Sequence, residues 1–200
     1  MISGIDISEN NGKINWSQFG NCDVKFAYIK ATEFLDSVDL QYAANVQSAK
    51  NAGLLIGAYH WLNPDFHVGQ QVDLFIRTVK NFKGMLPPAV CIQSYEGLLV
   101  DIEKNIRSFL MLLEKKTGVK PVIYTSDSFW KSNITQSDWG CNYPLWIDMP
   151  GNFWPNQLWP WAGWTFWQCS YNETIPGIQT AIGINQFNGS IETLHEMIIQ

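Results

Sequence analysis

The stretch Leu86-Pro-Pro-Ala-Val-Cys-Ile-Gln-Ser94 predicts the central strand of this 200-residue chain. The two prolines end the preceding segment, and aliphatic residues then alternate with Cys91 and Gln93. Successive side chains of a strand point to opposite faces, so Cys91 and Gln93 share one face, while Val90 and Ile92 face covering helices. An enzyme would place a pair of acids at such a position, but neither residue of this pair is an acid.

Apolar strands alternate with helical patterns on both sides of this stretch. Near-continuous apolar strands separated by helices indicate a buried parallel sheet in an α/β fold, and eight of them predict a closed barrel in a single domain over residues 1–200. In the last third of the chain, the segments between the predicted strands leave no room for full helices. Strands are expected at residues 2–7, 24–32, 54–62, 89–94, 121–126, 144–149, 164–170 and 181–187. Helices are expected from residue 36 or 37 to 52, and at 68–80, 97–116, 127–132 and 191–199.

The composition narrows the class of partner. Charged residues make up 16% of the chain, the net charge is −5 and no run of Lys or Arg occurs, which argues against nucleic acid or an anionic membrane. Aromatic residues reach 14%, with ten Trp. Aromatic faces stack on the C–H faces of sugar rings, so this aromatic content favours a carbohydrate ligand. The alternative is that these side chains belong to the hydrophobic core, with a few rings on the surface.

Cysteine and histidine positions predict neither a metal site nor a cofactor. The cysteines are widely separated and form no Cys-x-x-Cys pair, so we expect free thiols, with a Cys141–Cys169 bridge left open. His60, His67 and His195 fall on three different predicted elements.

The first residues read directly as a strand, so we expect neither a signal peptide nor a transmembrane segment. We therefore expect synthesis in the cytoplasm, with later release from the cell left open.

Function on a parallel barrel lies at the carboxyl ends of the strands. Those ends carry polar and aromatic residues, with no cofactor fingerprint, which suits a carbohydrate cleft. The spacing predicts that Asp6, Tyr59, Gln93, Tyr124 and Gln168 lie around one mouth. The full set is Asp6, Glu33, Tyr59, His60, Cys91, Gln93, Tyr124, Asp148, Gln168 and Asn185.

Several segments in order along the whole chain carry a family pattern. They include Gly4-Ile-Asp-Ile-Ser8, Phe26-Ala-Tyr-Ile-Lys-Ala-Thr-Glu33, Gly118-Val-Lys-Pro-Val-Ile-Tyr-Thr125 and Asn185-Gln-Phe-Asn-Gly-Ser190. Together they resemble glycoside hydrolase family 25, the lysozymes that cut the muramic acid–glucosamine link of peptidoglycan. The resemblance implies a (β/α)5(β)3 barrel with a groove for that amino-sugar glycan.

The family's chemistry rests on an Asp-x-Glu on strand four and on further Asp residues on strands one and eight. Asp6 matches the first strand's acid, whereas Cys91 and Gln93 stand at the Asp and Glu positions and Gly183 at the strand-eight position. Gln does not titrate, and a Cys with a pKa near ~8.5 is mostly neutral at pH 7. The resemblance therefore implies a catalytically degenerate member that keeps its groove.

Two alternatives stay open beside that interpretation. In an active glycosidase, the catalytic acid would have moved to Asp148 or Glu96. The other interpretation of Asp148 is a solvated loop residue, and that of Glu96 is an ordinary turn carboxylate. In a scaffold protein, the barrel would bind no glycan. Asp101 and Glu103 also spell Asp-x-Glu, but they point about 200° apart on a helix and cannot converge. The strand ends and the resemblance together give these expected groove residues: Glu33, Tyr59, Tyr124, Trp146, Asp148, Trp167, Gln168 and Asn185.

Overall fold

The computed structural model describes residues 1–93, 101–134, 137–151 and 153–200. Its strands are β1 (Ile2–Ile7), β2 (Phe26–Glu33), β3 (Ser37–Val38), β4 (Leu55–Trp61), β5 (Ala89–Ile92), β6 (Val122–Ser126), β7 (Leu145–Asp148), β8 (Phe166–Glu173) and β9 (Ile182–Phe187). Its α-helices are α1 (Tyr42–Asn51), α2 (Val68–Val79), α3 (Ile102–Thr117), α4 (Asp127–Asn133) and α5 (Ile191–Glu196). Short 3-10 turns lie at Glu9–Asn11, Trp16–Asn21 and Trp139–Asn142.

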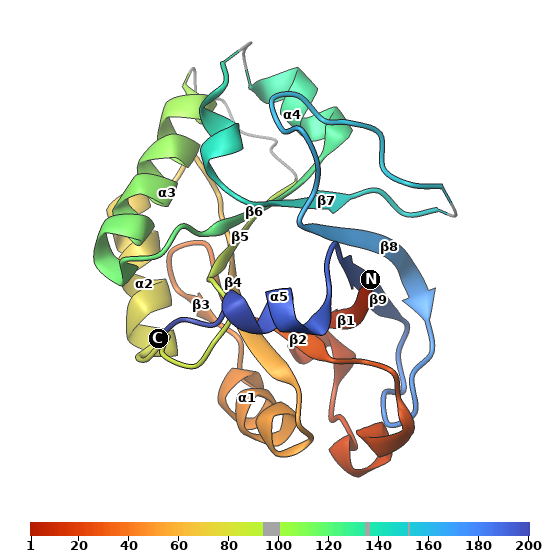
Figure 1. The fold of residues 1–200 in the computed structure, drawn as a ribbon. Coiled ribbons are helices and arrows are strands. Elements are labelled where there is room, and N and C mark those ends of the chain that lie inside the picture. Colours follow the sequence, from red (N-terminus) through yellow and green to blue (C-terminus); the bar gives the residue numbers. More distant parts are fainter. Residues whose placement is uncertain (94–100, 135–136, 152) are drawn as a thin grey trace.

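The sheet closes on itself. Its order is β1-β9-β8-β7-β6-β5-β4-β2-β3, and β1 also pairs with β2, which leaves the two-residue β3 outside the ring. Eight of the described strands therefore form a barrel, and α1 to α4 lie around its outside (Figure 1). This confirms the predicted closed α/β barrel with a simplified last third.

The direction of the last strand differs from the prediction of a wholly parallel barrel. β9 runs antiparallel to both β1 and β8, while the other pairs of the ring are parallel. The connection from β8 to β9 spans residues 174–181, and a parallel crossover needs a dozen or more residues. A short connection therefore returns the chain in the opposite direction.

Two apolar layers lie on the two sides of the sheet. Val90 and Ile92 belong to the outer layer with the helices, whereas Cys91 belongs to the barrel interior with Tyr28 and Phe166. This confirms the faces predicted from alternation in the central strand. At one end, α5 lies across the barrel in Figure 1 and buries Leu194 in the interior layer, so the other end holds the open mouth.

One predicted helix start is wrong, and the predicted start of another helix lies in residues that the structure does not describe. The helix expected from residue 36 or 37 begins at Tyr42, because Ser37 and Val38 pair with β2 after a turn at Phe34 (φ 53°). Helix α3 begins at Ile102, where the Asp101 side chain accepts a hydrogen bond from the Lys104 amide at 3.1 Å. Residues 97–100 of that prediction are not described.

All four cysteines are free thiols, with Cys141 exposed and Cys169 partly buried, which excludes the bridge between them that the sequence left open. Within the described residues, no helix combines the length and apolarity needed to cross a membrane.

The barrel interior predicts a sharp stability effect at Gly57. A Cβ at this position would lie 2.2 Å from the ring of Tyr28, a fully buried side chain whose hydroxyl donates to the Pro87 carbonyl at 3.1 Å. Gly57→Ala should lower the free energy of unfolding by about 1–3 kcal/mol through overpacking, measured by urea denaturation. The matched variant Gly163→Ala adds its Cβ to open space and should stay within about 0.5 kcal/mol of wild type. Equal effects of the two variants would contradict this account.

Candidate functional site

Inward-facing side chains at the open end of the barrel line a narrow pocket of about 40 Å³. That volume accommodates a water or a small substituent but not a sugar ring, so a bound sugar would lie above the pocket and insert only a substituent. The lining residues are Asp6, Tyr59, Trp61, Cys91, Tyr124 and Trp146. We call this region the mouth.

Asp6 is the centre of a hydrogen-bond network that spans the mouth. Its Oδ1 accepts from Gln168 Nε2 at 2.6 Å and from Asn185 Nδ2 at 2.8 Å. Trp146 Nε1 donates to Asn185 Oδ1 at 2.8 Å, and the Tyr124 hydroxyl donates to Gln168 Oε1. Each amide therefore accepts from an aromatic residue and donates to the same carboxyl oxygen.

Burial raises the pKa of Asp6 from 3.8 to about 6. Loss of hydration is the largest cause; the hydrogen bonds from Asn185 and Gln168 lower the pKa in part, and the nearby Asp148 carboxylate raises it further. Asp6, the strand-one acid that the resemblance identifies, thus changes its charge near pH 6.

Asp148, the last residue of β7, forms a second carboxyl site beside the first. It is only 7% exposed and accepts hydrogen bonds from the Gln93 amide and the Tyr171 hydroxyl. Burial raises its pKa above the ordinary value, while the bonds from Tyr171 and Gln93 oppose the shift. The interpretation of Asp148 as a solvated loop residue is therefore wrong.

Cys91 and Gln93, which lie near these two carboxyls, are both neutral. Cys91 is 3% exposed in the barrel interior, and burial raises its pKa well above 9.0, so the thiol keeps its proton. Gln93 follows the last residue of β5 and directs its amide to Asp148. Neither side chain ionises at neutral pH.

Gly183 leaves space that other residues of the network fill. It pairs with Asp6 across β9 and β1, and a Cβ added there would lie 2.3 Å from Asp6 Oδ1 and 2.4 Å from Gln168 Nε2. A side chain at position 183 would therefore displace the hydrogen bond between these two residues.

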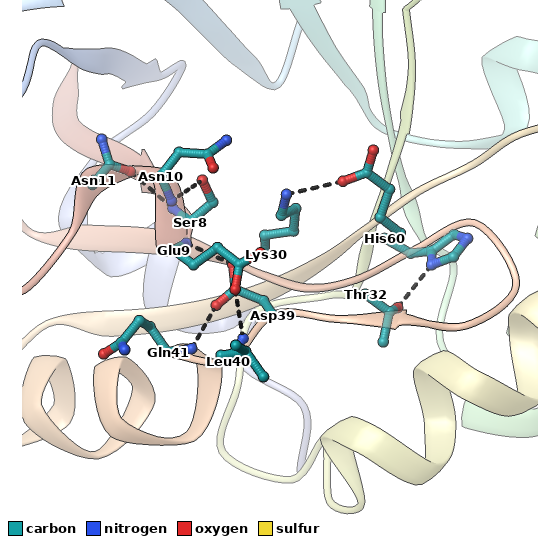
Figure 2. Close-up of polar contacts among 11 residues, drawn as sticks. Ser8, Glu9, Asn10, Asn11, Lys30, Thr32, Asp39, Leu40, Gln41 and His60 are labelled. Carbon is teal, nitrogen blue, oxygen red and sulfur yellow. Dashed lines mark hydrogen bonds and ion pairs between the residues drawn. The ribbon is translucent and has the colours of Figure 1, made fainter.

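The strand ends on the β2 side of the mouth are held by polar contacts (Figure 2). Lys30 Nζ lies 3.0 Å from Glu33 Oε2, with the lysine side chain 9% exposed. Thr32 Oγ1 lies 2.8 Å from His60 Nδ1, whose ring is fully buried and also contacts Gln71 at 3.2 Å. Burial lowers the pKa of His60 to about 4, so this histidine is a neutral core residue.

The loop that follows Asp6 is held by Asp39. Its carboxylate accepts from the Glu9 amide at 2.7 Å and from the Gln41 amide at 2.9 Å, and Glu9 in turn accepts from the Leu40 amide at 2.9 Å (Figure 2). These reciprocal bonds tie the turn after β1 to the residues that precede α1, and so limit the movement of one wall of the mouth.

Trp167 does not face the mouth, and Asp101 and Glu103 do not form an acid pair, as expected. Trp167 faces the outer layer, because its neighbours Phe166 and Gln168 point inward. Glu103 accepts a hydrogen bond from Trp139 Nε1 at 2.8 Å, while Asp101 caps α3, so these two acids do not converge. Glu96 lies outside the described residues.

Two residues at or beside the mouth were not predicted from the sequence. Trp61 lines the pocket from the last position of β4, and Tyr171 reaches Asp148 from the part of β8 that extends beyond the predicted strand end at residue 170. The aromatic content was the only signal for either. In the described part of the chain, no group of three or more His, Cys, Asp or Glu is arranged to hold a metal ion.

The pKa of Asp6 predicts a specific pH dependence of stability. Because the folded-state pKa is raised, the folded protein binds more protons than the unfolded chain between about pH 4 and 6, and stability falls as pH rises through this window, by up to about 3 kcal/mol. Asp6→Asn keeps an oxygen acceptor but cannot ionise. Its stability relative to wild type should therefore increase from pH 4 to 7 in urea denaturation. A constant difference between the two proteins would contradict the raised pKa.

Comparison with known proteins identifies the family. The family model described as glycosyl hydrolases family 25 matches residues 5–178. The chain is 32% identical to lysozyme M1 of Streptomyces globisporus over 96% of this chain and 70% of that protein. It is 31% identical to the uncharacterised protein YegX of Escherichia coli K12, covering 98% of this chain and 73% of YegX.

A solved structure agrees with the fold. The bacterial lysozyme of Streptomyces coelicolor superposes with a TM-score of 0.92 at 30% identity, covering 98% of this chain and 96% of that one. The family match extends over most of the chain, and both the sequence and the structural relatives span nearly all of it. The chain therefore belongs to glycosyl hydrolases family 25, the family to which the resemblance pointed.

Proposed function

We propose that this protein binds the amino-sugar glycan of peptidoglycan at the mouth and does not cleave it at the rate of a lysozyme. The observation that carries the proposal is that Cys91 and Gln93, at the positions that the resemblance assigns to the family's acids, are both neutral. The glycan class follows from the family, whose relatives include lysozyme M1. Its place of action would then be the cell wall.

The chemistry of glycoside cleavage supports the loss of turnover. The reaction ordinarily needs one carboxylic acid to protonate the leaving oxygen and a second carboxylate to stabilise or attack the sugar. Gln93 has no proton of suitable acidity to give, and the Cys91 thiol remains neutral. Loss of positioned proton transfer alone costs about 10²–10⁴-fold in rate.

The packing at Gly183 supports a site that has been reorganised for binding. A restored strand-eight acid would clash with Asp6 and Gln168, whose hydrogen bond occupies its space. The Asp6 carboxyl lines the small pocket and is held there by the amides of Gln168 and Asn185. Such a carboxyl can orient an acetamido group, since its oxygens accept a hydrogen bond from the amide N–H.

Aromatic side chains supply the remaining recognition. Tyr59, Trp61 and Trp146 surround the pocket, so a sugar lying above it would contact ring faces and edges. Stacking on aromatic rings and neutral hydrogen bonds depend little on ionic strength, unlike attraction between charges.

Asp148 supports a second candidate function, a glycosidase with a relocated acid. Its raised pKa keeps a proton at higher pH than a free aspartate would, and Gln93 and Tyr171 hold both carboxyl oxygens. In this alternative, Asp148 would protonate the glycosidic oxygen and ionised Asp6 would stabilise the developing positive charge. A scaffold protein without a glycan ligand is the outcome if neither binding nor cleavage is found.

The first prediction from this proposal concerns turnover. Clearing of purified peptidoglycan by the wild-type protein should fall about 10²–10⁴-fold below that of a family lysozyme, measured by turbidity at equal concentration. Gln93→Glu should recover slight clearing, because a buried Glu near Asp6 and Asp148 has a raised pKa. Strong wild-type clearing that disappears in Asp148→Asn and survives in Gln93→Ala would establish the second candidate instead.

The second prediction concerns binding. A muramyl oligosaccharide should bind with a Kd of about 10⁻³–10⁻⁵ M by calorimetry, equivalent to roughly 4–7 kcal/mol. Added salt should change the Kd little, and Asp6→Ala should weaken it roughly tenfold through the loss of a charge-assisted hydrogen bond. No heat at millimolar ligand, together with no effect of Asp6→Ala, would favour the scaffold.

A further inference from the structure

The loop that joins β7 to β8 carries exposed aromatic side chains. It extends away from the barrel in Figure 1, and its described residues form no helix. Phe153 is 85% exposed, Trp154 61% and Trp159 59%. Exposed Trp and Phe gathered on one short segment indicate an interaction surface.

Neighbouring rings hold Trp154 in place. Its ring centroid lies 5.7 Å from that of Trp164 and 6.2 Å from that of Trp167, and the ring planes of Trp154 and Trp167 are 25° apart. Trp167 Nε1 donates to the Met149 carbonyl at 2.7 Å, and Asn188 Nδ2 donates to the Trp164 carbonyl at 3.0 Å. Both supporting tryptophans are thus tied to other segments, and Trp154 is presented with a fixed face.

Core packing accounts for the buried residues of this region but not for the exposed ones. Leu158, Trp161 and Trp167 are 2%, 4% and 6% exposed and cover the outer side of β7 and β8. Trp161 also donates its indole N–H to the Tyr143 carbonyl at 2.8 Å. These three side chains complete the outer layer, and the exposed side chains of Phe153 and Trp154 do not contribute to its packing.

The segment that carries Trp154 contains no charged residue. Residues 149–172 include five of the ten tryptophans and contain no Asp, Glu, Lys, Arg or His. Trp164 borders a pocket of about 250 Å³ that is also lined by Asn156 and Gln157, a size just under the ~300 Å³ of small drug-like ligand sites. Flat rings beside neutral amides match the C–H face and the hydroxyl or acetamido groups of one sugar.

We propose that Trp154, Trp164 and the adjoining pocket with Asn156 and Gln157, here called the loop platform, bind the N-acetylated sugar rings of an uncharged glycan. A membrane surface fits less well, because the segment lacks the Lys and Arg side chains that attract anionic lipids. A protein partner fits less well because interfaces use Arg as well as aromatic anchors.

The loop platform is separate from the mouth and goes beyond the function proposed for it. Gln168 points into the barrel toward Asp6, while the preceding Trp167 supports Trp154 on the outer side of β8. Opposite faces of one strand thus serve the two sites. No mouth residue contributes to the loop platform, so each site can be tested without the other.

The indole N–H signals of the ten tryptophans provide the test in a nitrogen-15 NMR titration with chitohexaose, an uncharged oligomer of N-acetylglucosamine. Trp154→Phe and Trp164→Phe assign the platform signals, and Trp61→Phe assigns a mouth signal. We expect both platform signals to shift and saturate at millimolar sugar. Trp154→Ala should weaken that binding roughly tenfold, read from the Trp164 signal, while Trp154→Phe keeps most of it. Met111→Ala, at a 56%-exposed position on α3, should leave the titration unchanged.

The outcomes separate the two proposals. A shift of the Trp61 signal without any shift of the Trp154 and Trp164 signals overturns the loop platform and leaves the mouth proposal standing. Platform shifts with an unmoved Trp61 signal support the loop platform and count against glycan binding at the mouth. A Trp164 signal that moves equally in wild type and in Trp154→Ala overturns the inference in favour of non-specific contact. Platform signals that move only with protein concentration overturn it in favour of self-association, and signals that respond to phosphatidylcholine vesicles and not to sugar overturn it in favour of a lipid surface.

Discussion

The two hydrogen bonds that Asp6 accepts from Gln168 and Asn185 connect the first strand of the chain to its last two. They lie where the barrel closes, since β1 pairs with β2 on one side and with the antiparallel β9 on the other. A buried carboxyl without such donors would cost several kcal/mol, whereas two amide donors make the position tolerable even when it is ionised. Closure of the fold and the chemistry of the mouth therefore depend on the same contact.

If positions 91, 93 and 183 are those of the other family acids, as the resemblance implies, this contact gives a reason why Asp6 alone would persist. Asp6 joins three strands, whereas Cys91 lies on β5 and Gln93 just after it, so changes there leave the closure contact in place. Cys91 fits the apolar interior, and Gln93 satisfies Asp148 without adding a third charge near two carboxyls with raised pKa values. On the correspondence that the resemblance implies, neutral groups at positions 91 and 93 would reduce like-charge repulsion in a confined volume.

Alternation of apolar residues allowed the strands and their faces to be predicted, as Val90, Cys91 and Ile92 illustrate. The direction of β9 could not be predicted, because periodicity does not report strand direction and only the short connection excludes a crossover. Trp167 was assigned to the groove from the resemblance alone, and a register argument from inward-facing Gln168 would have placed it outside. Tyr171 approaches Asp148 only because β8 continues past the barrel, which depends on long-range pairing with β9.

Between β7 and β8 the described residues form no covering helix, and this feature of the fold determines the chemistry of the surface there. A helix would bury this part of the sheet with a stripe of aliphatic residues, whereas a loop must do so with fewer and larger side chains. Trp161 and Trp167 perform that packing at 4% and 6% exposure, and their size allows further rings to stack outside them. Once Trp167 is held by the Met149 carbonyl, Trp154 can rest against it at little additional ordering cost. A preformed aromatic face on this side of the barrel is therefore a direct consequence of the simplified last third of the fold.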